Sequence, residues 1–203
     1  MTGRQDIIFL AVLIPSVILH EIMHGVVALA FGDDTAKRAG RLSINPIRHV
    51  DPFGTLILPA ILLLVGATPF GWAKPVPVNS GRMRSPRNNG LLVSLAGPAT
   101  NLVLAAAATA AYRIEHPQGT VGEVLLFLGF ANVVLAVFNM IPIPPLDGSS
   151  LIERVLPRRW WPGYLRFRGR AMGLLLVVML ALPSLFGHIL QPAVDTWYRI
   201  VHA

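Results

Sequence analysis

The first long apolar run of this chain, residues 6–31, carries three ionisable side chains in its interior, at His20, Glu21 and His24. A run of this length is enough for a helix that crosses the hydrocarbon core of a bilayer, which takes about 20 residues. Ionisable groups are costly at that depth and usually mark a functional site. The chain is therefore expected to fold in a membrane and to direct these three groups away from lipid.

The spacing of the three groups indicates a metal site. His20 and His24 are four residues apart, so on a helix both imidazoles lie on one face and can reach one metal ion. The pattern HExxH is typical of zinc hydrolases, in which the Glu acts as the general base. Chance, or two histidines satisfied by packing, are the alternatives, and the cost of burying three such groups in an apolar helix favours function.

Composition agrees with a membrane protein, because 54% of the 203 residues are hydrophobic and only 13% are charged, whereas soluble domains carry about 25% charged residues. The absence of cysteine excludes thiolate ligands and a cysteine nucleophile. We predict an all-α polytopic membrane protein with a single domain over 1–203, a catalytic core at about 6–150 and a C-terminal interfacial segment and last helix at 151–203. The five apolar segments are at about 6–31, 53–70, 89–112, 121–141 and 170–190.

The second apolar segment, 53–70, is interrupted by Pro59 and Pro69, and the distribution of basic residues tests whether it crosses. If it crosses, 11 of the 17 Lys and Arg residues lie on one side of the membrane and six on the other; if it turns back, the division is 14 against three. The positive-inside rule favours the second arrangement, and it explains the net charge of +7 without nucleic acid as a partner. We therefore predict about four transmembrane helices plus a re-entrant or interfacial segment at 53–70.

A catalytic zinc site needs a third protein ligand beside the two histidines. The candidates within or bordering the apolar segments are His49, Asp51, Asp147 and His188. His188 falls at the wrong depth, whereas His49 and Asp51 lie in a loop that is able to approach the site. If 53–70 turns back, segment 121–141 runs in the same direction as the first helix and delivers Asp147 to the basic side, near His24. The topology thus favours Asp147.

Three motifs together resemble the site-2 protease family of intramembrane zinc metalloproteases, in its compact prokaryotic form without a PDZ or CBS domain. They are HExxH in the first helix, Gly97-Pro98-Ala99-Thr100-Asn101 in a middle helix, and the run from Asn139 through Pro142, Pro144 and Pro145 to Leu146-Asp147-Gly148. The resemblance implies that His20, His24 and Asp147 bind one zinc ion and that Glu21 is the catalytic acid and base. It also makes Asn101 a candidate catalytic residue that holds the substrate carbonyl or the developing oxyanion, with a hydrogen bond between helices as the alternative.

The function expected from the residues and the resemblance is intramembrane hydrolysis of peptide bonds in or near the transmembrane helices of membrane-anchored proteins. The protein is expected in a prokaryotic cell membrane with its active site towards the cytoplasmic side, and its partners are the lipid bilayer and transmembrane protein substrates. A metal-binding membrane transporter and a catalytically silent membrane scaffold are the alternatives.

Two further features concern the residues around the site. Alternation around Leu42 and Ile44 predicts a short β-hairpin at about 39–50, whose edge would add a strand to an unwound substrate; an ordinary connecting hairpin is the alternative. Asn132 and Asn139 are seven residues apart and share one helical face, where packing or helix-end hydrogen bonds are the favoured roles.

Overall fold

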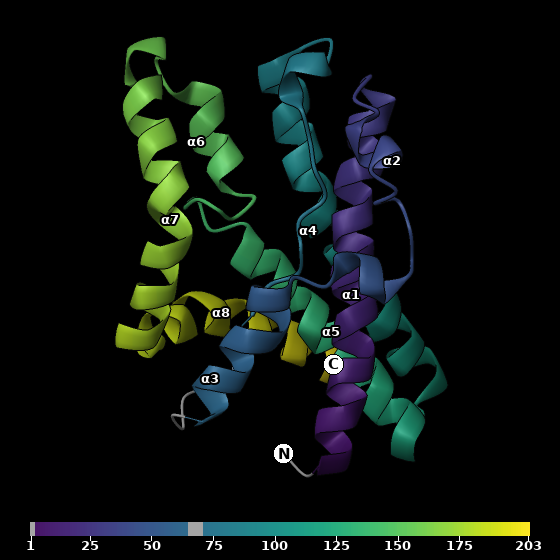
Figure 1. Ribbon diagram of the computed structural model, residues 1–203. Coiled ribbons are helices and arrows are strands. Elements are labelled where there is room, and N and C mark those ends of the chain that lie inside the picture. The colour runs from purple at the N-terminus through teal and green to yellow at the C-terminus, as the bar shows by residue number, and fades with distance from the viewer. Residues whose placement is uncertain (1–2, 65–70) are drawn as a thin grey trace.

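The computed structural model describes residues 3–64 and 71–203, and this part of the chain is built from helices without a strand. Three helices, α1, α4 and α5, are long and apolar enough to cross a membrane, which confirms the predicted all-α polytopic class. The helices are α1 (Gly3–Ala30), α2 (Thr35–Arg38), α3 (Leu58–Leu64), α4 (Pro86–Glu115), α5 (Gly119–Asn139), α6 (Ser149–Val155), α7 (Trp161–Ala181) and α8 (Pro183–His202) (Figure 1).

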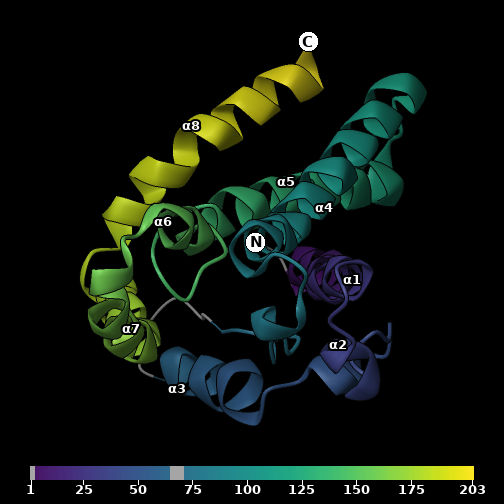
Figure 2. The ribbon, with the colours of Figure 1, turned by 90° about the horizontal axis from the view of Figure 1, so that it is seen from above.

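The two ends of α1 fix the directions of its neighbours. At its start, Arg4 forms an ion pair of 3.0 Å with Glu123, in the first turns of α5. At its other end, Asp34 is 3.1 Å from Arg82, just before α4 begins. Helices α1 and α5 therefore run parallel and α4 runs antiparallel to both, and Figure 2 shows the three side by side. The parallel course predicted for 121–141 is confirmed.

The segment that joins α1 to α4 begins and ends at the same end of the molecule. Asp33, just after α1, is fully buried and accepts a hydrogen bond of 2.6 Å from the amide of Asn79. Burial would raise the pKa of Asp33, but hydrogen bonds from Thr35 and Asn79 outweigh this effect and hold the pKa below its ordinary value. The Asp33 carboxylate is therefore ionised at neutral pH.

Between these ends the chain descends beside α1 to a π-helical turn (Pro52–Ile57) and α3, and returns along 71–79 (Figure 1). The apolar helical stretch Pro52–Leu62 is shorter than a membrane span. The described part of 53–70 therefore makes no net crossing, as predicted; residues 65–70 lie outside the described residues.

The predicted β-hairpin at about 39–50 is wrong. In place of strands, Asn45 caps a 3-10 turn (Pro46–His49) by accepting a hydrogen bond of 3.0 Å from the amide of Ile47. The local Asn-Pro turn chemistry outweighs the alternation around Leu42 and Ile44, because no second strand is available to pair with it. The strand edge expected to receive an unwound substrate at 39–47 is therefore absent.

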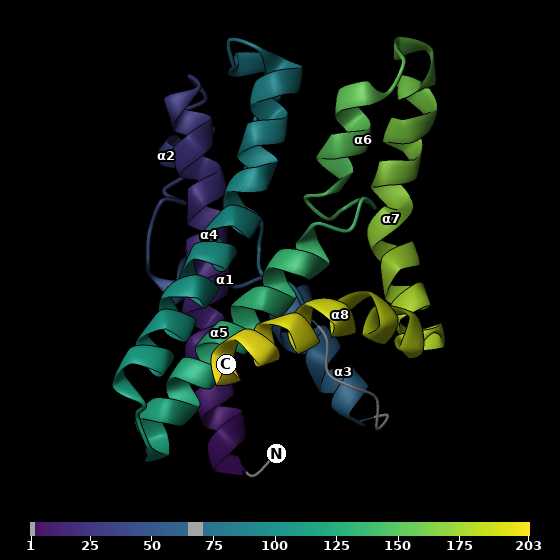
Figure 3. The same ribbon diagram turned by 180° about the vertical axis from the view of Figure 1, so that it is seen from behind.

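The predicted last span, 170–190, is not one straight helix. Pro183 lacks an amide proton and disfavours a helical conformation in Leu182, whose φ and ψ are −132° and 58°. The chain consequently bends by 87° between α7 and α8. Helix α8 then lies across α5, with Trp197 and Val201 packed against Val133 (Figure 3). A fourth span exists only if this bent pair counts as one.

The arrangement of the helix ends predicts which loops face the same side of the membrane. Single cysteines at Lys37, Arg84 and Arg159 should react with an impermeant maleimide from one side, and a cysteine at Gln118 should react from the other. The natural chain has no cysteine and gives an unlabelled control. Labelling of the cysteines at 37 and 84 from opposite sides would mean that 53–70 crosses the membrane.

Candidate metal centre

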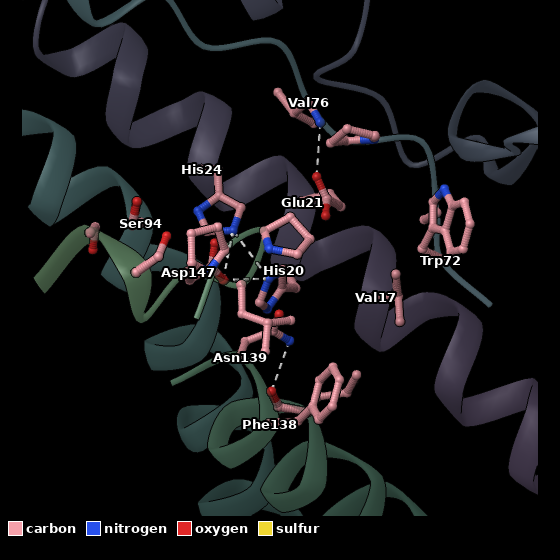
Figure 4. Close-up of a pocket in the computed structure, with 18 of the residues that line it drawn as sticks. Val17, His20, Glu21, His24, Trp72, Val76, Ser94, Phe138, Asn139 and Asp147 are labelled. Carbon is pink, nitrogen blue, oxygen red and sulfur yellow. Dashed lines mark hydrogen bonds and ion pairs between the residues drawn. The ribbon is translucent and has the colours of Figure 1, made fainter. Parts of the chain in front are cut away.

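Three ligand atoms, two from α1 and one from the loop after α5, converge in the interior of the helix bundle. The Nε2 atoms of His20 and His24 are 3.1 Å apart, and Oδ2 of Asp147 lies 3.1 Å from the first and 3.3 Å from the second. Among the described residues this is the one group of three His, Asp or Glu side chains close enough to hold a metal ion. Figure 4 shows the three side chains pointing towards one another.

The size of this triangle fits zinc. Zinc bonds to histidine nitrogen and carboxylate oxygen at about 2.0–2.1 Å, so tetrahedral ligands are separated by about 3.3–3.4 Å. Oδ2 of Asp147 is buried and has no hydrogen-bond donor among the described residues. Such an oxygen is costly to leave unpaired, and a cation at the centre of the triangle would satisfy it.

Both imidazoles direct Nε2 towards the centre of the triangle. Nδ1 of His24 lies 2.7 Å from the carbonyl oxygen of Val93, and Nδ1 of His20 lies 2.5 Å from Oδ1 of Asn101. Each of these oxygens is an acceptor, so each Nδ1 carries the proton and each Nε2 is left with a free lone pair. This is the usual way in which outer partners fix the tautomer and orientation of metal-binding histidines.

Behind His20 the hydrogen bonds continue through three helices. The amide of Asn101 donates to Oδ1 of Asn132 at 2.7 Å, and Asn132 donates to the hydroxyl of Ser16 at 2.8 Å. Asn101 and Asn132 are 0% exposed and Ser16 is 1% exposed. Because unpaired polar groups are costly in a buried environment, this series of hydrogen bonds fixes the separation of α1, α4 and α5.

Gly97 gives the imidazoles the space that they occupy. A Cβ atom at this position would lie 2.5 Å from Nε2 of His24 and 2.5 Å from Cε1 of His20. In the sequence, Gly97 had no assigned role beyond its place in the Gly97–Asn101 motif, so this contact is new. Gly97 and Asn101 are one helical turn apart and so share a face, which is the signal that could have revealed it.

Asp147 is positioned by a loop that folds back onto the end of α5. The amide of Gly148 donates a hydrogen bond of 2.7 Å to the carbonyl oxygen of Asn139. A Cβ atom on Gly148 would lie 2.2 Å from the carbonyl oxygen of Met140. Gly148 has an ordinary φ of −58°, so glycine is required here for space and not for a left-handed conformation.

The other candidate ligands have different roles. His49 is buried and its Nε2 lies 2.7 Å from the carbonyl oxygen of Ser43. Asp51 caps the π-helical turn by accepting a hydrogen bond of 2.7 Å from the amide of Gly54. His188 is on α8, where its Nδ1 is 2.7 Å from the carbonyl oxygen of Ser184. None of the three joins the described metal cluster.

Glu21 and the three ligands line a cavity of about 1130 Å³. The carboxylate of Glu21 points from α1 towards the returning segment 71–79 and accepts a hydrogen bond of 2.9 Å from the amide of Val76 (Figure 4). One wall of the cavity is apolar. It includes Phe9, Leu13 and Val17 of α1 and Phe130, Val134 and Phe138 of α5.

Comparison with known proteins agrees with this geometry. The sequence pattern of Peptidase family M50 matches residues 8–117 and 111–182. YwhC of Bacillus subtilis (strain 168), which bears the name of a zinc metalloprotease, is 45% identical over 154 residues, which are 71% of this chain and 67% of YwhC. Rip2 of Mycolicibacterium smegmatis, with a name of the same kind, is 31% identical over 197 residues, which are 90% of this chain and 66% of Rip2. The chain thus spans about two thirds of these relatives, and no solved structure matches it.

The hydrogen bond from His20 to Asn101 predicts a measurable effect on metal affinity. Asn101→Leu should weaken zinc binding by about 10–100-fold, the usual effect of removing an outer partner of a metal ligand. The measurement is a competition titration of the purified protein with a chelator. Asn88→Leu, on the exposed start of the same helix, is the matched control and should leave affinity unchanged. Equal affinity of the two variants would contradict the assigned role.

Proposed function

The chain belongs to peptidase family M50, and we propose that it is an intramembrane zinc endopeptidase that cleaves transmembrane segments of membrane-anchored proteins. The observation that carries the proposal is the convergence of His20, His24 and Asp147 on one point, beside Glu21, within helices long enough to cross a membrane. A site of this kind offers a metal and a general base to a peptide bond that soluble enzymes cannot reach.

The shape and lining of the cavity support a transmembrane substrate. Its apolar side is formed by residues spaced four apart on α1 and on α5, which are parallel helices. Apolar side chains of a substrate segment fit this wall, while its backbone needs polar partners to leave the helical state, since unsatisfied backbone groups are costly in lipid. Glu21 and Asp147, which line the same cavity, are among the polar groups that it offers.

Zinc held by the two imidazoles and the carboxylate would supply Lewis acidity, which polarises a carbonyl group and acidifies water near neutral pH. The remaining work falls to residues of the chain. The Glu21 carboxylate accepts the proton of the attacking water and donates it to the leaving amine. His20 and His24 keep their orientation, with Nε2 towards the metal, because Asn101 and the Val93 carbonyl accept hydrogen bonds from their Nδ1 atoms.

For Asn101 we propose a positioning role in place of the expected contact with the substrate. Its side chain is fully buried, its oxygen accepts from His20 and its amide donates to Asn132. The amide has a second N–H group, but a fully buried side chain could reach a substrate carbonyl only by leaving this position, which would break both hydrogen bonds.

The proposed orientation places the site nearer the cytoplasm. Of the 17 Lys and Arg residues, 14 belong to segments 37–87 and 154–170. Segment 37–87 begins just beyond the end of α1 that lies nearest the metal ligands. The positive-inside rule assigns such loops to the cytoplasmic side.

The proposal predicts that Glu21→Gln separates catalysis from metal binding. The variant should retain zinc, because Glu21 is not among the clustered ligand atoms, and should lose about 10²–10⁴-fold in the rate of cleavage, the usual contribution of a general base. The measurement is cleavage of a designed transmembrane segment in proteoliposomes, with zinc content determined on the same sample.

Removal of zinc by a chelator should also stop cleavage, and added zinc should restore it. Metal-dependent transport that persists in Glu21→Gln, without cleavage by the wild type, would contradict the proposal and favour a transporter. A wild type that binds zinc but has neither activity would favour a silent scaffold.

A further inference from the structure

The carboxylate of Glu21 is held from outside its own helix. Its partner is the amide of Val76, at 2.9 Å, in a segment that lines the cavity beside α1. We call residues 72–79 the strap. The strap lines the cavity through Trp72, Ala73, Pro75, Val76 and Val78, and Figure 4 shows Val76 directly over Glu21.

The strap is fixed on both sides of Val76. On one side, the amide of Lys74 donates to the carbonyl oxygen of His49 at 2.9 Å, and the carbonyl oxygen of Lys74 accepts a hydrogen bond from the guanidinium of Arg41. On the other side, Asp33 accepts from the amide of Asn79 at 2.6 Å. Arg41 is 7% exposed, so a buried charge is committed to holding this backbone.

Two prolines restrict what the strap can do. Pro75 and Pro77 flank Val76 and have no amide proton. Val76 therefore supplies the one backbone donor of residues 75–77, and that donor is already used by Glu21. A strap with so few free donors is a poor edge for pairing with a substrate strand, and the amide of Val76 is bonded to Glu21 instead.

Gly25 allows the strap to approach α1. This residue is one helical turn beyond Glu21 and lies on the same face. A Cβ atom at Gly25 would lie 3.0 Å from Cγ1 of Val76 and 2.5 Å from Cδ2 of Leu42. A Cβ atom here would require Leu42 to move and would crowd the side chain of Val76, next to the amide that reaches Glu21.

We propose that the strap is a positioning device for the general base, and that Gly25 and Arg41 are positioning residues that act through it. The inference rests on the proposed function of Glu21. One carboxylate oxygen is fixed by the Val76 amide, which restricts the rotamers of a long side chain and leaves the second oxygen available towards the cavity. Displacement of the strap leaves the zinc ligands intact but releases Glu21.

The test compares Gly25→Ala with Gly173→Ala, a matched change on α7 where a Cβ atom meets nothing within 4 Å. Gly25→Ala should lower kcat about tenfold or more, because small displacements of a catalytic group are costly, while KM stays within about twofold and zinc content is unchanged. Hydrogen exchange of the Val76 amide should become faster. Gly173→Ala should match the wild type in all four measurements.

Arg41→Lys keeps the charge and one donor at the other side of the strap. Its kcat and its rate of hydrogen exchange at the Val76 amide should lie between those of the wild type and of Gly25→Ala. Arg41→Ala should resemble Gly25→Ala. This pair also tests the proposal if Gly25→Ala fails to fold. Unchanged kcat in Gly25→Ala and Arg41→Ala, or loss of zinc in step with kcat, would overturn the positioning role.

Exchange of the Val76 amide separates this inference from the proposed function. Glu21→Ala should accelerate that exchange whether or not the wild type cleaves any peptide. Unchanged exchange would overturn the strap contact alone. Absence of wild-type cleavage together with faster exchange in Glu21→Ala would confirm the contact and overturn the catalytic role that the inference assigns to it.

Discussion

The structure depends on the meeting of two imidazoles from α1 with a carboxylate from the loop after α5. Because the three ligand atoms lie within 3.3 Å of one another, the loop must reach the depth of His20 and His24. That requirement is met only if α5 runs parallel to α1. The segment between α1 and α4 must then return to the side on which it started, so the metal site and the re-entrant course of the chain are one constraint.

Small and polar residues let the helices come close enough to build the site. Gly97 leaves room for both imidazole rings, and one turn later Asn101 accepts a hydrogen bond from Nδ1 of His20. The hydrogen bonds continue to Asn132 and Ser16. In lipid, where helices gain little from apolar contact, such close packing and interhelical hydrogen bonds hold a bundle together. The same contacts that stabilise α1, α4 and α5 therefore orient the ligands.

The sequence predicted the group of metal ligands better than it predicted the elements packed around them. The four-residue spacing of His20 and His24 carries its own geometry, and the charge distribution supplied the direction that brings Asp147 to them. The contacts of Gly25 could not be predicted, because a sequence does not specify which faces of separate elements meet; for Gly97 the one signal is the helical face that it shares with Asn101. The predicted hairpin at 39–50 does not form, because the local Asn-Pro turn prevails over the alternation of apolar residues. The last span is bent, because Pro183 interrupts the helix at Leu182.

The account rests on a zinc ion held by two histidines and one aspartate inside the bundle, and X-ray absorption at the zinc edge of the purified protein tests it most directly. The predicted spectrum is that of a four-coordinate site with two imidazole nitrogens and oxygen ligands at about 2.0–2.1 Å. In Asp147→Ala the site should lose a carboxylate oxygen and most of its zinc. A six-coordinate site formed only by oxygen, or a spectrum that Asp147→Ala leaves unchanged, would contradict the account.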